Sequence, residues 1–208
     1  MKISHVVQVC EPYMNDKIIL LLGPSGIGKT TVLKHFTKKV KSVNALTMDN
    51  ITHRLAREMG LIGHKDDLNA LIAVLEDDRE RLLNFGIDAV HQYIANNKSN
   101  STIIDVGTGF LDAPSSSAWV ASHPSVSIVA SPDCAYDRFR KARQLDISYE
   151  QYLSTQFSKT RSDIYNKAGV VLKTNQLSEI EVAHKFACCV LGVMPTDIAR
   201  LALQEWLN

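Results

Sequence analysis

Long apolar runs are missing from this chain. No stretch approaches the roughly 18 consecutive apolar residues that a membrane-spanning helix needs. The opening residues, MKISHVVQVCEPYMND, also lack the apolar core and the cleavage pattern of a secretory signal. We therefore expect a soluble, cytoplasmic protein without a membrane partner.

Metal-binding and disulfide spacings are also absent. The four cysteines, at positions 10, 134, 188 and 189, match neither a zinc site nor a disulfide framework. The seven histidines include no HxxxH or HExxH pattern. The chain also has no excess of positive or negative charge, because its net charge is only +1. A balanced chain gives no electrostatic footprint for nucleic acid, so no nucleic-acid partner is expected.

Length and composition predict one α/β domain. With 208 residues, of which 45% are apolar and 22% charged, the chain is long enough for one packed core and short for two. We expect residues 17–191 to form this domain. Residues 1–16 are expected to be a leader or an added edge strand, and residues 192–208 a C-terminal helix appended to the same domain.

The segment KIILLLGPSGIGKTT, residues 17–31, carries the clearest functional pattern. Ile18–Leu22 is an apolar run ended by Gly-Pro, which predicts a strand buried on both faces. The residues after it fit the P-loop spacing GxxxxGK[ST], in which glycines let successive N–H groups face phosphate oxygens at a helix N-terminus. The predicted nucleotide-binding residues are Gly23, Pro24, Ser25, Gly26, Ile27, Gly28, Lys29, Thr30 and Thr31.

Two residues of this loop have predicted chemical roles. Lys29 would neutralise the β- and γ-phosphates, and the Thr30 hydroxyl would ligate Mg²⁺. ATP and Mg²⁺ are therefore the expected cofactors.

Acidic residues follow two further predicted strands. Asp49 follows Val43–Met48, and Asp105 lies within Thr102–Gly109. Acids at the carboxyl ends of strands in an open α/β sheet lie where ligands bind. Asp105 is expected to hold Mg²⁺ in the manner of a Walker B strand, with a loop cap as the alternative. Asp49 is expected to contact the acceptor hydroxyl or the metal shell, with a cap of the following helix as the alternative.

Cationic and polar segments follow in the second half of the chain. The predicted helix Asp133–Leu145 carries several arginines that would clamp a transferring phosphoryl group, Arg143 above all. Asp146–Lys159 has little periodicity, which suits a lid.

Strands and helices alternate along the chain. Ser125–Ala130 and Gly169–Lys173 complete five predicted strands. Helical patterns cover Thr30–Val40, Asp66–Asn97 and Ser178–Leu191, and a Ser/Pro-rich connection is expected over Asp112–Pro124. This alternation predicts a parallel sheet with helices on both faces. The last predicted helix, Thr196–Leu207, has one apolar face that would pack on the domain or on a second copy of the chain in a homodimer.

The chain resembles the shikimate kinase family of small P-loop kinases. The likeness spans about Lys17–Leu191 and is carried by the P-loop, the Asp49 turn, the segment Thr102–Gly109 and the stretch RSDIYNKA at Arg161–Ala168. The resemblance implies a three-layer P-loop kinase fold with strand order 2-3-1-4-5 and a lid around residues 140–160. It also implies that adenine lies near Arg138 and the loop containing Asn175.

The same resemblance implies how an acceptor is bound. Arg161 is similar to an arginine that binds an acceptor carboxylate, and Asp49 approximately matches an aspartate that engages the acceptor hydroxyl. The family's glycine segment on the acceptor side corresponds to Gly107, Thr108 and Gly109.

The chain departs from the family's pattern at two positions. Asp105 stands where the family usually lacks an acid, and Gly86 stands where the family has another carboxylate-binding arginine. Arg81, about one helical turn upstream of Gly86, is a candidate substitute.

Together these features predict an ATP- and Mg²⁺-dependent kinase that phosphorylates a hydroxyl of a small anionic metabolite. The predicted catalytic residues are Lys29, Asp49 and Arg143, with Gly107, Thr108, Gly109 and Arg161 binding the small-molecule acceptor. Two alternatives are a kinase for a nucleotide or another phosphate ester, and a nucleotide-binding regulatory module without turnover.

Overall fold

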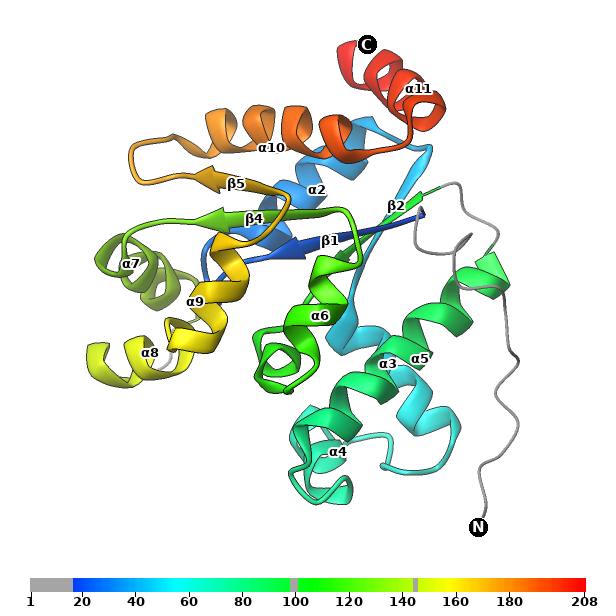
Figure 1. Ribbon diagram of the computed structural model, residues 1–208, viewed down its shortest axis with the longest axis vertical. Helices are drawn as coiled ribbons and strands as arrows, with labels where there is room; N and C mark the ends of the chain where they lie inside the picture. The colour runs from blue at the N-terminus through cyan, green and yellow to red at the C-terminus, as the bar shows by residue number, and fades with distance from the viewer. Residues whose placement is uncertain (1–16, 98–100, 144–145) are drawn as a thin grey trace.

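A five-stranded parallel sheet forms the centre of the molecule (Figure 1). The computed structural model describes residues 17–97, 101–143 and 146–208, so the expected leader or edge strand at 1–16 lies outside the described residues. The strand order is β2-β3-β1-β4-β5, and all four neighbouring pairs are parallel. This confirms the predicted α/β fold and strand order. The strands are β1 (Ile18–Leu22), β2 (Val43–Thr47), β3 (Ser101–Asp105), β4 (Ser125–Val129) and β5 (Val170–Lys173).

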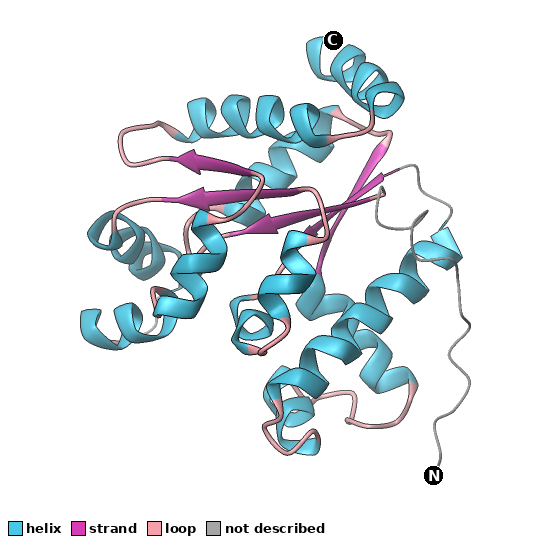
Figure 2. Ribbon diagram, in the orientation of Figure 1, coloured by secondary structure: helices cyan, strands magenta, loops and turns pink. Residues whose placement is uncertain are grey.

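Helices cover both faces of this sheet (Figure 2). Alternate residues of β1 point to opposite faces, because side chains along a strand have a period of two. Ile18, Leu20 and Leu22 therefore join one core cluster, and Ile19 and Leu21 join the other. The first cluster includes residues of α3 (Met48–Glu58), α4 (Leu68–Val74), α5 (Arg79–Asn97), the 3₁₀-helix η1 (Thr108–Asp112), α6 (Ser116–Ala121) and α9 (Lys159–Asn166). The second includes residues of α2 (Lys29–Lys39), α7 (Pro132–Arg143), α8 (Tyr149–Gln156), α10 (Glu179–Val193) and α11 (Thr196–Leu207).

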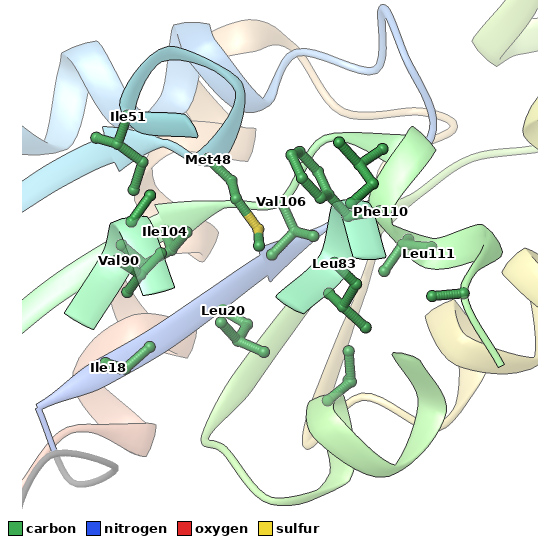
Figure 3. Packing of buried hydrophobic residues seen from close by; sticks show 14 of the residues in the cluster. Ile18, Leu20, Met48, Ile51, Leu83, Val90, Ile104, Val106, Phe110 and Leu111 are labelled. Carbon is green, nitrogen blue, oxygen red and sulfur yellow. The ribbon is translucent and has the colours of Figure 1, made fainter. Parts of the chain in front are cut away.

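The first cluster fixes the loop that leaves β3. Figure 3 shows Met48, Leu83, Val106 and Phe110 packed together over β1. Val106 and Phe110 are fully buried on either side of the glycine segment that begins at Gly107. Their burial anchors this segment at both ends, so its backbone is held at the carboxyl edge of the sheet.

Three predicted segments differ from the structure. The helical pattern of Asp66–Asn97 forms two helices, α4 and α5, because the chain turns at Glu76 and Asp77 with φ of 60° and 57°. The connection expected over Asp112–Pro124 contains α6. The aperiodic segment Asp146–Lys159 contains α8, whose only buried residue is Tyr152. A helix with one buried side chain leaves no apolar stripe for periodicity to detect.

The C-terminal helix α11 packs on the body of its own chain. Trp206 stacks on Phe36 of α2 with ring centroids 5.9 Å apart, and Ala202 is fully buried in the second cluster. The Glu205 carboxylate accepts hydrogen bonds from the backbone N–H of Lys41 at 2.7 Å and of Ser42 at 3.0 Å. Among the described residues, no helix is both long and apolar enough to cross a membrane.

Candidate active site

The P-loop joins β1 to α2 at the carboxyl edge of the sheet. Gly28 is the N-cap of α2 and has a left-handed backbone with φ of 108°, which side chains other than glycine rarely adopt. A Cβ on Gly23 would overlap the carbonyl oxygen of Ile128 in β4. The loop therefore lies directly against the neighbouring strand. Its N–H groups precede α2, where the helix dipole favours phosphate.

Lys29 lies inside this loop and pairs with Asp105. Its ammonium donates to the carbonyl oxygens of Gly23 at 2.8 Å and Pro24 at 3.3 Å. It also lies 3.6 Å from a carboxylate oxygen of Asp105, the last residue of β3. Both side chains are about 10% exposed. A buried carboxylate needs a partner of this kind, because burying an unpaired charge is costly.

Asp49 and Arg143 complete a charged group around this pair. Burial raises the pKa of Asp105 above its ordinary value, the nearby Asp49 raises it further, and Lys29 opposes both effects. Burial also raises the pKa of Asp49, against the opposing charges of Lys29 and Arg143. Arg143 is the exposed last residue of α7. The predicted catalytic residues Lys29, Asp49 and Arg143 thus interact electrostatically in one site.

The carboxylate of Asp49 lies on the backbone of Gly107. A Cβ added to Gly107 would overlap an oxygen of that carboxylate. Asp49 is the second residue of α3, and the N-cap of this helix is Thr47. Asp49 is therefore not the N-cap of α3. By contrast, a Cβ on Gly109 would meet nothing within 4 Å.

Arg161 is already engaged by another side chain. Its Nε and one terminal nitrogen donate to the two carboxylate oxygens of Asp112, at 2.8 and 2.6 Å. The other terminal nitrogen donates to the carbonyl oxygen of Thr155 at the end of α8. Arg161 thus joins α9, η1 and α8. Any acceptor carboxylate would have to compete with Asp112 for this guanidinium.

Arg138 and Asn175 lie together, on the β4 and β5 side of the loop. The guanidinium of Arg138 donates to the hydroxyl of Thr174 at 2.8 Å and to its carbonyl oxygen at 2.7 Å. The side-chain oxygen of Asn175 accepts the backbone N–H of Ser131 at 2.7 Å. The structure therefore brings together the two residues that the resemblance associates with adenine. Their contact with a nucleotide stays a prediction.

The residues expected to hold Mg²⁺ fit that role only together with a nucleotide. Thr30 is exposed in the first turn of α2, and Asp105 lies at the end of the adjacent strand β3. No group of three or more His, Cys, Asp or Glu side chains suited to a metal occurs in the described part of the chain. Mg²⁺ commonly uses one or two protein oxygens and completes its shell with phosphates and water, which this pair allows.

Comparisons with known proteins agree with this geometry. A family model described as ABC transporter matches residues 13–179. The chain belongs to this family. The match includes both the P-loop and β3, the two segments that carry Lys29 and Asp105. No curated protein sequence matches this member of the family.

The solved structures that this ABC transporter family member resembles include small P-loop kinases. A shikimate kinase from Bacteroides thetaiotaomicron has a TM-score of 0.58 and 16% identity, over 83% of this chain and 97% of that one. A shikimate kinase from Acinetobacter baumannii in complex with shikimate has a TM-score of 0.53 and 20% identity, over 85% and 93%. A gluconokinase from Sinorhizobium meliloti has a TM-score of 0.52 and 17% identity, over 93% and 97%. At such low identities these likenesses establish the fold, which implies nucleotide binding.

Sequence reasoning missed the contacts between α8 and the P-loop. The backbone N–H of Ser25 donates to the side-chain oxygen of Gln156 at 2.9 Å, and Tyr152 donates its hydroxyl to the carbonyl oxygen of Ser25 at 2.9 Å. Ser148 and Gln151 form a capping box at the start of α8. That capping signal predicts a helix, and a helix places Tyr152 and Gln156, four residues apart, on one face.

At Gly86, where the resemblance notes a missing arginine, the structure leaves no space for a side chain. Gly86 is buried in α5, and an added Cβ would lie 2.5 Å from Cε of Met48 and 2.8 Å from a ring carbon of Phe110. Arg81, the candidate substitute, pairs with Glu76 at 3.3 Å, and its side chain is about half exposed.

Proposed function

We propose that this protein is an ATP- and Mg²⁺-dependent kinase that transfers the γ-phosphoryl group to a hydroxyl of a small metabolite. The observation that supports it is the grouping of Lys29, Asp105 and Asp49 at the carboxyl edge of a small P-loop kinase fold. The names of the neighbours, shikimate kinase and gluconokinase, support a small-molecule acceptor.

Each of these residues has a chemical task in the proposal. Phosphoryl transfer needs positioning and charge neutralisation more than covalent chemistry, and the ammonium of Lys29 supplies a fixed positive charge. Arg143, the last residue of α7, adds positive charge near the same two acids and would clamp the phosphoryl oxygens. When bound, Mg²⁺ would add charge neutralisation at the phosphates, held by Thr30 and Asp105.

Asp49 orients the acceptor and accepts its proton. Burial raises its pKa above that of an ordinary aspartate, which makes it a stronger base, and the charges of Lys29 and Arg143 oppose that rise. The carboxylate of Asp49 lies close to the backbone of Gly107, because Gly107 has no side chain to separate them. The acceptor hydroxyl therefore binds between Asp49 and the phosphoryl group.

The experiment that tests this proposal is a phosphoryl-transfer assay with MgATP. A panel of hydroxylated acids, sugars and nucleotides is followed by ³¹P NMR, and ADP is expected to appear together with one phosphorylated acceptor. Lys29→Ala should lower kcat/KM by about 100-fold or more, because a preorganised charge at the transferring group is lost. Lys34→Ala, which removes an exposed lysine of the same helix, should leave kcat/KM unchanged.

The outcomes separate the proposal from its alternatives. Full activity in Lys29→Ala, with an unchanged circular dichroism spectrum, would refute the assigned role. Transfer confined to nucleotides or other phosphate esters would favour the second kinase class. MgATP binding without transfer to any acceptor would favour a nucleotide-binding module.

A further inference from the structure

The starting point is the charge around the place where an acceptor must bind. The acceptor hydroxyl has to reach the phosphoryl group at Lys29 and Asp105, beside Asp49. Asp49 lies on Gly107, and the chain continues from Gly107 directly into η1. The acceptor therefore meets η1 and the element that η1 holds, which is α9 through the pair of Asp112 and Arg161.

The cation of this pair is closed to an anionic ligand. Arg161 donates to both oxygens of Asp112 and to the Thr155 carbonyl, and only 9% of its side chain is exposed. The guanidinium already donates a pair of parallel hydrogen bonds to the carboxylate of Asp112, so the same two N–H groups cannot bind a second carboxylate. A ligand carboxylate would also approach the negative charges of Asp49 and Asp112 themselves.

The anion of the pair, by contrast, remains open. The side chain of Asp112 is 34% exposed. A carboxylate has about four lone-pair sites, and Arg161 uses one on each oxygen. The spare lone pairs can accept hydrogen bonds from hydroxyl groups.

We infer that the acceptor is an uncharged, multiply hydroxylated molecule, a sugar or polyol, and that Asp112 determines this specificity by neutralising Arg161 and accepting the acceptor's hydroxyls. This inference rests on the proposed kinase function and names its substrate class. Asp49 receives the proton of the reacting hydroxyl as the new bond from oxygen to phosphorus forms and ADP leaves. Asp112 binds the other hydroxyls and takes no part in the bond changes.

The test compares acceptors matched in all but one carboxylate. The wild-type protein with MgATP is assayed on sorbitol against gluconate, and on a cyclohexane polyol against the same ring carrying a carboxylate. The uncharged member of the preferred pair should show at least a 10-fold higher kcat/KM. An equal or higher value for the carboxylated member would overturn the inference and leave the kinase proposal standing. No transfer to any acceptor would overturn both.

A variant pair then tests the role of Asp112. Asp112→Asn leaves the guanidinium of Arg161 without its anionic partner, so the preference for the uncharged acceptor should shrink or reverse, with the change mainly in KM. Asp163→Asn, which removes an exposed acid from α9, the helix that carries Arg161, should keep the wild-type preference. A folded Asp112→Asn protein with an unchanged preference ratio would refute the specificity role, and the wild-type comparison decides the substrate class even if this variant fails to fold.

Discussion

Gly107 shows how the position of the side chain of Asp49, which we propose to act in catalysis, depends on a neighbour that has no side chain. Its backbone has φ of −60° and ψ of 139°, which alanine adopts without strain. The consequence of adding a side chain is therefore steric, because the new Cβ would overlap the carboxylate of Asp49.

Gly107→Ala should lower kcat by about 10- to 100-fold, since a displacement of about 1 Å in a reacting group is enough for that loss. The midpoint of thermal unfolding should change little. Gly109→Ala is the matched control, because its Cβ would meet nothing within 4 Å. Steady-state kinetics on both variants check this, and equal kcat values would show that Asp49 does not need its present position.

The candidate site residues that could be predicted from the sequence are those that belong to a local sequence pattern. Lys29 and Thr30 belong to one short motif, and Asp105 ends an apolar strand, so each has a signal within a few residues. Asp112 and Gln156 have no such signal. Their partners Arg161 and Ser25 lie 49 and 131 positions away in the chain, and only the tertiary fold brings them together.

The helix α8 helps to hold the P-loop in place. It binds both backbone groups of Ser25, through Gln156 and Tyr152. The same helix also contacts α9, because the carbonyl oxygen of Thr155 accepts a hydrogen bond from the guanidinium of Arg161. The lid expected around residues 140–160 therefore includes a helix that is attached to the nucleotide site, and the motion of this segment stays a prediction.

Gln156→Glu should weaken the binding of MgATP and raise its Kd by about 10-fold. The carboxylate can still accept the Ser25 N–H, but its charge lies beside the polyphosphate and opposes binding. Ser154→Glu adds the same charge to an exposed position of α8 and serves as the control. Titration of both variants with MgATP by calorimetry checks this, and the same affinity in both would show that Gln156 does not face the phosphates.

Elements were predictable where their residues share one buried face. The five strands and the helices α2, α10 and α11 carry repeated apolar positions, and their types were correctly predicted. α6 and α8 were missed because each buries too few side chains to produce a period. The break between α4 and α5 was missed because two acidic residues, Glu76 and Asp77, adopt positive φ where glycine would be the usual signal.

The stability of the whole molecule should depend on pH through His123. This residue lies between α6 and β4 and is 8% exposed; its Nδ1 is 2.8 Å from the carbonyl oxygen of Trp119. Burial lowers the pKa of His123 below its ordinary value of 6.5. The unfolded chain therefore takes up a proton at a higher pH than the folded one does.

The free energy of unfolding should fall as the pH is lowered through 6.5, by the part that His123 contributes. The raised pKa values of Asp49 and Asp105 give a slope of opposite sign, so the effect is measured as a difference between proteins. His123→Phe should lose stability less steeply than the wild type between pH 7.5 and 5.5 in urea unfolding. His64→Gln, at an exposed position, should keep the wild-type slope; equal slopes in all three proteins would contradict the prediction.

The order of the strands has a consequence for synthesis. β1 lies between β3 and β4, so the first described strand has neither neighbour until Ser101–Asp105 and Ser125–Val129 have been translated. A nascent chain therefore carries an apolar segment and a glycine-rich loop without support for much of its elongation, as parallel sheets built from distant segments generally do. The growing polypeptide can bind a nucleotide only after its second half has been translated, and a ribosome that stalls early releases an aggregation-prone fragment in place of a smaller nucleotide-binding domain.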